Sequence, residues 1–145
     1  MARSKRIKPI VSMAHNLERE AARALGEALA YLDENVKQLN LLFTYREEYN
    51  QKLQASGSQG MSGQELNEYR QFIKKIADAI ENQQKAIDQA KQNLEEKKQF
   101  WFAKRGRSKA LDKVLDRYLD DERRQQEKRL QKELDDRAGQ KTPVS

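Results

Sequence analysis

Mainly apolar residues recur at steps of three and four along two long stretches of this chain. The first stripe is Leu17, Ala21, Leu25, Ala28, Leu32, Val36, Leu39, Phe43, Arg46, Tyr49 and Leu53. The second stripe is Leu66, Tyr69, Ile73, Ile76, Ile80, Gln83, Ile87, Ala90, Leu94, Lys97 and Trp101. Because such steps bring side chains to one face of an α-helix, the pattern predicts two amphipathic helices.

The two stripes match position by position when the chain is folded back on itself. Antiparallel pairing sets Leu39 opposite Ile80 and Leu25 opposite Leu94, and the residue numbers of every pair sum to 118 or 119. A constant sum fixes one register along both helices. The sequence therefore predicts an all-α fold, a long antiparallel two-stranded coiled-coil hairpin.

Glycine, serine and proline positions indicate where the helices begin and end. Pro9 precedes the first stripe, and a run with three glycines separates the two stripes. Ser62 with Glu65 three residues later is a capping-box pattern that opens a helix. The predicted segments are a first coiled-coil helix over 10–54, a hairpin loop over 55–63, a second coiled-coil helix over 64–137, and flexible termini over 1–9 and 138–145.

The second predicted helix outlasts the first. Continuing the same register pairs Ile10 with Ser108 and Ile7 with Leu111, where the first helix has run out of residues. We therefore expect a C-terminal helical overhang from Asp112 to Arg137. Its apolar residues, which have no predicted partner in the chain, are Leu115, Tyr118, Leu119, Leu130 and Leu134.

Composition supports a thin coiled coil and not a globular domain. Of 145 residues, 37% are hydrophobic and 36% are charged, with a mean hydropathy of -1.08. This leaves too little apolar surface for a globular core of that size. No apolar run approaches the roughly 18 residues that span a bilayer, and no apolar signal segment follows the basic N-terminus. We expect a cytoplasmic protein.

The sequence offers little for catalysis. The chain has one histidine, His15, and no cysteine. Carboxylates on a solvated helical surface lack the burial that shifts a pKa. No glycine-rich phosphate loop precedes a helix. We expect a protein that is not an enzyme, with no catalytic, cofactor-binding or metal-binding residues and no cofactor.

Basic residues gather toward the open end of the predicted hairpin. Lys97, Lys98, Lys104, Arg105, Arg107 and Lys109 occur without an intervening acid, and the register lays Arg3, Lys5, Arg6 and Lys8 beside them. A solvated charge run and a nucleic-acid surface are both alternatives. Because no nucleic-acid recognition motif accompanies the charge, docking into an acidic protein partner is favoured.

A second candidate surface lies nearer the loop. Phe72 and Ala79 each stand one position before a stripe residue, so with Ile76 and Gln83 they form a stripe rotated off the seam and partly exposed. One interpretation is a widened core against Leu42 and Phe43. The other is a docking site for an apolar groove or an extended segment.

Several stretches resemble the flagellar type III export protein FliJ family, in order and spacing, from about Arg6 to Ala138. They are Ala22-Arg23-Ala24-Leu25-Gly26-Glu27, Tyr45-Arg46-Glu47-Glu48-Tyr49, Glu68-Tyr69-Arg70-Gln71-Phe72-Ile73 with Ala79-Ile80-Glu81, and Gln131-Lys132-Glu133-Leu134-Asp135-Asp136. Two departures are that some members carry an aromatic residue near the place of Arg137 and a histidine where Gln83 stands.

The resemblance implies a non-enzymatic stalk and adaptor, similar to the central stalk of rotary ATPases. Its terminal end would enter the hexameric export ATPase FliI, with Arg3, Lys5, Arg6, Lys8, Lys104, Arg105, Arg107 and Lys109 as the ATPase-binding residues. Phe72, Ile76, Ala79 and Gln83 would contact the export gate protein FlhA, and the protein would also escort export chaperones.

The implied location is the cytoplasm, peripheral to the inner membrane at the export apparatus, without stable membrane insertion and without a nucleic-acid partner. Three alternatives remain open on the sequence. They are a generic coiled-coil scaffold, a stalk homologue of virulence type III secretion, and a basic nucleic-acid-binding hairpin.

Overall fold

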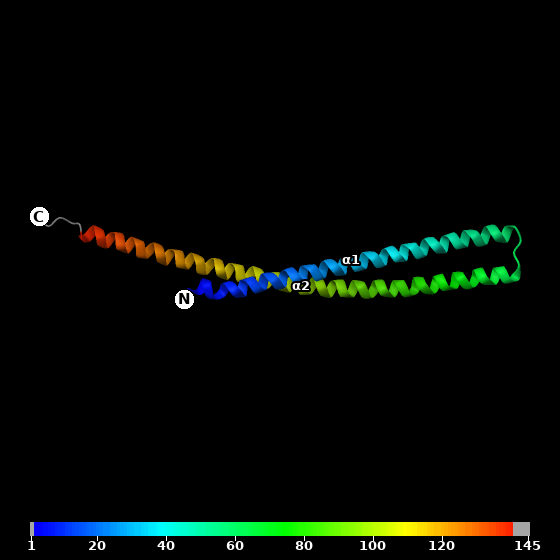
Figure 1. Cartoon of the computed structure of the whole chain (residues 1–145), viewed down its shortest axis with the longest axis horizontal. Coiled ribbons are helices and arrows are strands. Elements are labelled where there is room, and N and C mark those ends of the chain that lie inside the picture. Colours follow the sequence, from blue (N-terminus) through cyan, green and yellow to red (C-terminus); the bar gives the residue numbers. More distant parts are fainter. Residues whose placement is uncertain (1, 141–145) are drawn as a thin grey trace. The chain divides into compact units, whose positions relative to one another are not determined.

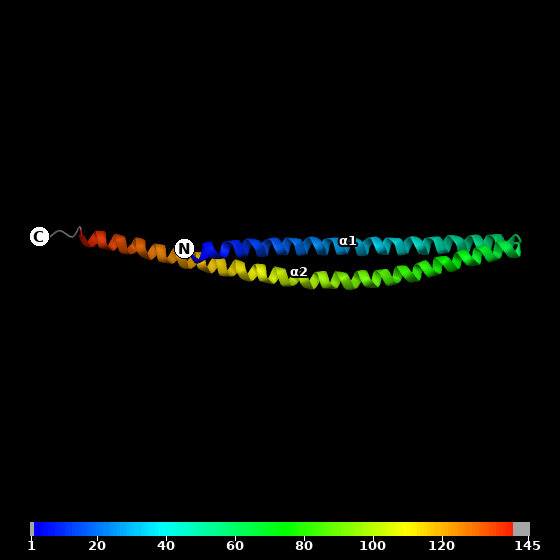
Figure 2. The ribbon, with the colours of Figure 1, turned by 60° about the horizontal axis from the view of Figure 1, so that its bottom comes forward.

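The computed structural model describes residues 2–140 and consists of two α-helices joined by a short loop (Figure 1). α1 comprises Arg3–Ser58 and α2 comprises Gly63–Gln140. The two helices run antiparallel in both ribbon views (Figures 1 and 2). The fold is the predicted all-α helical hairpin.

The hairpin divides into two compact units, to each of which both helices contribute. Residues 22–100 form the loop unit, which contains the connection between the helices. Residues 1–21 and 101–145 form the terminal unit.

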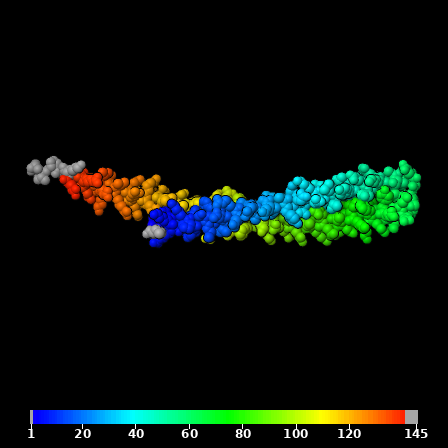
Figure 3. Space-filling model, in the orientation of Figure 1, coloured from blue at the N-terminus to red at the C-terminus, as the bar shows by residue number. Residues whose placement is uncertain are grey.

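The loop unit has the register that the stripes predict. Gln83 donates from Nε2 to both the backbone oxygen and Oδ1 of Asn35, each at 2.9 Å. The ring centroids of Tyr49 and Tyr69 lie 6.5 Å apart. In both pairs the residue numbers sum to 118, so these contacts confirm the register here. The side chains of the two helices meet directly along this unit (Figure 3).

The core of the loop unit is narrow, as expected for two helices. Its buried apolar side chains are Ala28, Ile76, Ile80, Ile87 and Ala90. Two positions of the first stripe do not lie in the core. Val36 is exposed, and Asn35 lies opposite Gln83 in its place. Arg46 is also exposed, with its guanidinium 5.0 Å from the Phe43 ring centroid.

The connection between the helices is shorter than the glycine content predicts. α1 continues through Gly57 to Ser58, where the predicted helix stops at residue 54. A glycine inside a helix costs only about 1 kcal/mol, so its presence does not force an end. Within residues 2–140, Gly60 is the one residue with a positive φ, 86°. Ser62 accepts a hydrogen bond from the backbone N–H of Glu65 at 3.2 Å, which caps α2.

At the other end, α1 begins at Arg3 and includes Pro9, whereas the predicted helix begins at residue 10. A proline inside a helix lacks the N–H that would bond one turn earlier. Contacts with α2 hold the segment in spite of this loss. Ser4 donates from its backbone N–H and from Oγ to the carboxylate of Glu122, at 3.1 and 2.7 Å, and Val11 is buried.

The predicted register is wrong in the terminal unit. Ser4 contacts Glu122, and His15 Nε2 lies 2.7 Å from Asp112 Oδ1. These residue numbers sum to 126 and 127, and those of Arg3 and Tyr118, whose guanidinium and ring lie 5.8 Å apart, sum to 121. The contacts are thus displaced by about 4 to 12 Å of helix rise from the expected pairs. Ser4 and Ser108 are the buried polar residues here. Where small and polar residues replace bulky apolar ones, hydrogen bonds and close packing decide the register.

The overhang is correspondingly shorter than predicted. Leu115 and Tyr118 are half-buried against α1, and the Arg3 guanidinium lies 5.8 Å from the Tyr118 ring centroid. Every residue of α2 from 123 to 140 is exposed, and this end of the helix has no segment of α1 beside it (Figure 3). Leu130 and Leu134 are 54% and 57% exposed. As predicted, neither packs against α1.

Neither described helix has a stretch that is both long and apolar enough to cross a bilayer.

Candidate interaction surfaces

The single histidine holds the two helices together in the terminal unit. Its hydrogen bond to Asp112 connects α1 to α2, and both side chains are a little under half exposed. Among residues 2–140, no cluster of three or more histidine, cysteine or acidic side chains has a geometry that would hold a metal ion. The geometry around His15 therefore indicates a structural contact.

The N-terminal basic segment consists of Arg3, Lys5, Arg6 and Lys8, and all four side chains are exposed. It lies beside Tyr118 and Glu122 of α2. The pKa of Glu122 is lowered from its ordinary value of 4.5, first by the hydrogen bonds from the Ser4 side chain and backbone, and then by the positive charges of Lys8 and Lys5. A carboxylate thus balances part of the charge on this segment.

The second basic group belongs to α2. Arg105 is half-buried, with its guanidinium 5.1 Å from the Trp101 ring centroid, and Lys104 is also half-buried. Arg107 and Lys109 are exposed. These four residues form the α2 basic run.

The expectation of one positive cluster at the open end is wrong. Because the register shifts in the terminal unit, the N-terminal basic segment lies beside Tyr118 and Glu122 and not beside the α2 basic run. Tyr118 lies nine positions beyond Lys109, about 13 Å along the helix. The terminal unit therefore has two basic groups at different positions along α2.

The four residues of the predicted gate-binding stripe do not form one exposed surface. Phe72 is 42% exposed and Ala79 is half-buried, but Ile76 is only 6% exposed and belongs to the core. The amide group of Gln83 donates hydrogen bonds to Asn35. The structure thus places Phe72 and Ala79 outward and the other two toward α1.

Phe72 belongs instead to an aromatic cluster that the sequence interpretation did not assemble. Its ring centroid lies 4.2 Å from that of Tyr49, whose ring also has the Lys52 ammonium 5.2 Å away. With Tyr69 these residues line a shallow groove of about 510 Å³ together with Ser56, Glu65 and Glu68. The pairing of Tyr49 with Tyr69 in the stripe register was the signal that could have located this cluster.

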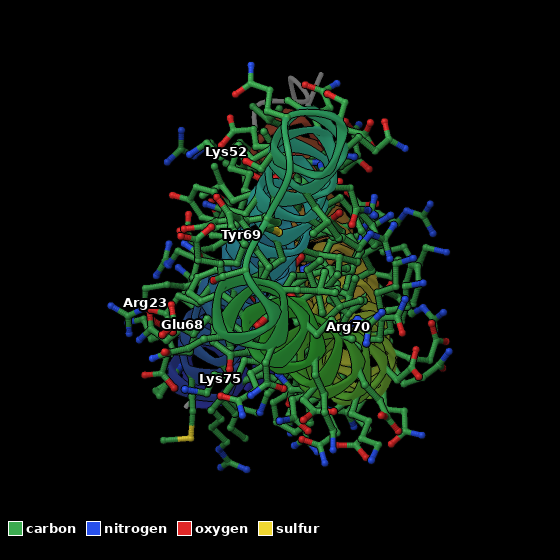
Figure 4. All side chains as sticks on the ribbon, turned by 90° about the vertical axis from the view of Figure 1, so that its right-hand side faces the viewer. Arg23, Lys52, Glu68, Tyr69, Arg70 and Lys75 are labelled. Carbon is green, nitrogen blue, oxygen red and sulfur yellow. The ribbon has the colours of Figure 1, made fainter. Side chains whose placement is uncertain are left out.

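The view along the helices from the loop shows how the groove is oriented. Lys52, Glu68 and Tyr69 lie on one flank, whereas Arg70 points to the other (Figure 4). The aromatic groove is therefore a feature of one side of the loop unit.

Comparisons with known proteins show the family of this chain. The sequence model of the family described as flagellar FliJ protein matches residues 4–142, nearly the whole chain. This chain belongs to the flagellar FliJ family. It is 27% identical over 117 residues to the flagellar FliJ protein of Salmonella typhi and 26% identical over 117 residues to that of Escherichia coli (strain K12). Each match covers 81% of this chain and 80% of the relative. Membership of the FliJ family makes the protein a component of the flagellar export apparatus.

Proposed function

We propose that this FliJ family member is a non-enzymatic stalk and adaptor of the flagellar export apparatus. Its terminal unit docks into the hexameric export ATPase FliI, and its loop unit contacts the export gate protein FlhA. The protein also escorts export chaperones. It acts in the cytoplasm, peripheral to the inner membrane at the export apparatus.

The observation that carries ATPase docking is the basic surface on both helices of the terminal unit. Lys5, Arg6 and Lys8 of α1 and Arg107 and Lys109 of α2 are all exposed. A helix pair with cations on both members suits an acidic channel that surrounds it, because charge complementarity speeds and orients association.

Contact with the gate protein is supported by the outward side chains of the predicted stripe. Phe72 exposes a large apolar ring, and Ala79 leaves room beside it for a partner to approach α2. We assign Phe72 and Ala79 to the contact itself. Ile76, which is buried, and Gln83, which bonds to Asn35, hold this part of α2 against α1.

The ATPase contact is tested by reversing charge in the α2 basic run, where Arg107→Glu and Lys109→Glu affect exposed groups only. The double variant should bind FliI more weakly and stimulate its ATPase activity less, and added salt should reproduce the effect in the unchanged protein. Helical content measured by circular dichroism should not change.

The matched control reverses two exposed cations of the loop unit, Lys75→Glu with Lys91→Glu, and should stimulate FliI normally. Equal losses in both double variants would show that only net charge matters and would contradict docking at the terminal unit. If Arg107→Glu with Lys109→Glu instead abolishes DNA binding and leaves ATPase stimulation intact, the nucleic-acid alternative is favoured.

The gate contact is tested by Phe72→Ala and Ala79→Asp, which should reduce binding to FlhA and bacterial motility. Loss of the ring contact with Tyr49 should lower the free energy of unfolding of Phe72→Ala by only about 1 kcal/mol. Ile80→Ala, in the buried core, should cost about 2 kcal/mol or more. If Phe72→Ala is as destabilising as Ile80→Ala and binds FlhA normally, the ring is part of the core.

A further inference from the structure

The first three turns of α1 have a second apolar stripe on the flank of the face that is buried against α2. Val11 and Ala14 are buried against α2, whereas Ile10 is 50% and Met13 is 64% exposed. Because a helix turns 100° per residue, Ile10 and Met13 share an outer face that is rotated away from the buried residues. Pairing with α2 does not account for two large apolar side chains on this face.

Cations continue the same stripe toward the N-terminus. Arg3, Arg6, Ile10 and Met13 follow one another at steps of three, four and three, so the two guanidinium groups lie in line with the two apolar side chains. Residues 1–17 contain no aspartate or glutamate. We call Arg3, Arg6, Ile10 and Met13 the outer stripe.

The neighbouring part of α2 extends this surface with an aromatic ring. Arg3, Arg6, Ile7, Ile10 and Tyr118 line a shallow groove of about 270 Å³. The carboxylates beside it are those of Asp121 and Glu122, which line the adjoining hollow with Arg3, and Glu122 already accepts two hydrogen bonds from Ser4. Cations and apolar groups thus dominate the outer stripe.

We propose that the outer stripe binds the surface of an anionic lipid bilayer. Ile10 and Met13 would enter the boundary between headgroups and acyl chains, while Arg3 and Arg6 meet lipid phosphates, with Lys5 and Lys8 adding long-range attraction. The apolar pair stands on the convex outer side of a helix, and a bilayer conforms to such a surface without a preformed pocket. This inference goes beyond the proposed function and requires neither FliI nor FlhA.

The direct test is co-sedimentation of the full chain with vesicles. Vesicles of equal parts phosphatidylglycerol and phosphatidylcholine should bind at least tenfold more strongly than vesicles of phosphatidylcholine alone, because four cations each gain free energy near an anionic surface. Added salt should weaken this binding. Equal binding to both kinds of vesicle, or no binding to either, would overturn the proposal.

The apolar part of the outer stripe is tested separately from its charge. Ile10→Asn with Met13→Asn keeps every cation and should lower binding to phosphatidylglycerol vesicles by about tenfold or more, since two apolar side chains no longer enter the interface. The matched control is Leu29→Asn, which replaces an apolar residue that is 50% exposed in the loop unit and should bind normally. Unchanged binding in the double variant would reduce the effect to nonspecific charge attraction and exclude insertion of this face.

Orientation is measured with an environment-sensitive fluorophore, which needs only one added thiol because the chain contains no cysteine. A label on Ile10→Cys should gain fluorescence with phosphatidylglycerol vesicles, whereas a label on Ser12→Cys, exposed on another face of the same segment, should not. An equal response at both positions would contradict the assigned face. If neither label responds while Ile10→Asn with Met13→Asn loses binding to FliI, the outer stripe is a protein interface and the lipid proposal fails.

Discussion

Single polar residues add specificity to the pairing of these two helices. Gln83 stands at a core position of α2 and satisfies its amide on Asn35 of α1. A polar side chain in a coiled-coil core favours the register in which it finds a partner, at some cost in stability. Ser4 with Glu122 and His15 with Asp112 serve the terminal unit in the same way.

Replacement of Gln83 by alanine should lower the free energy of unfolding by about 1 kcal/mol, because both hydrogen bonds to Asn35 are lost. Urea denaturation followed by circular dichroism measures the change. Gln84→Ala, at the exposed neighbouring position, should unfold like the unchanged protein. Equal destabilisation by the two substitutions would contradict a role for the Asn35 contact.

Acidification should loosen the first turns of α1. The folded-state pKa of Glu122 is lowered from 4.5, so its ionised form stabilises the folded state above that value. This contribution is lost as the pH falls below 4.5 through the lower folded-state pKa. The protection factors of the amides of residues 4–8, in which the intrinsic pH dependence of hydrogen exchange is divided out, should therefore fall in acid in the unchanged protein.

Glu122→Gln provides the control for this pH dependence. It removes the ionisable group, so the protection factors of residues 4–8 should already be lower near neutral pH and should change little further in acid. A full acid response in Glu122→Gln would assign the effect to other carboxylates.

The regular spacing of apolar residues along the helices predicts the register of the loop unit but not that of the terminal unit. The loop unit has bulky apolar residues at almost every heptad position, and the contacts of Tyr49 and Gln83 follow the predicted sum. In the terminal unit the buried residues are Val11 and four small ones, Ser4, Ala14, Ala21 and Ser108. Small side chains permit several offsets, so the pattern there does not distinguish between them.

Disulfide trapping distinguishes the two registers. In the loop unit, Leu39→Cys with Ile80→Cys should cross-link readily, and Leu39→Cys with Ile73→Cys, about 10 Å further along α2, should not. The opposite preference would overturn the register.

In the terminal unit, Ser4→Cys with Glu122→Cys should form a disulfide, because these side chains already meet. Ser4→Cys with Val114→Cys, the pair that continues the loop-unit register, should not, since it is offset by about 12 Å. Gel mobility under nonreducing conditions measures both. Preferential cross-linking to position 114 would show that one register runs through the whole hairpin.

Both units contribute buried residues to the hairpin, whereas the last part of α2 contributes none. No residue from 123 to 140 is buried. Because stability in such a hairpin comes from the contacts between α1 and α2, these residues are available for partners without cost to the fold.

A stop codon after Arg124 should therefore leave the thermal midpoint of the remaining hairpin within a few degrees of the full chain. A stop codon after Ala103 should lower it clearly, because Ser108 and Glu122, which pack against or bond to α1, are then missing. Circular dichroism during heating measures both. A large loss in the longer fragment would show that the overhang packs against the hairpin.

The sequence by itself determined that this chain is a two-helix hairpin, where its loop lies and which residues face each other in the loop unit. The reason is that bulky apolar side chains at a regular spacing leave one arrangement that buries them. Contacts in the folded chain decide that α1 continues through Pro9, that the N-terminal basic segment lies beside Glu122, and that Phe72 stacks on Tyr49. These features depend on contacts between residues far apart in the chain, where small and polar side chains leave the helical pattern without a preference.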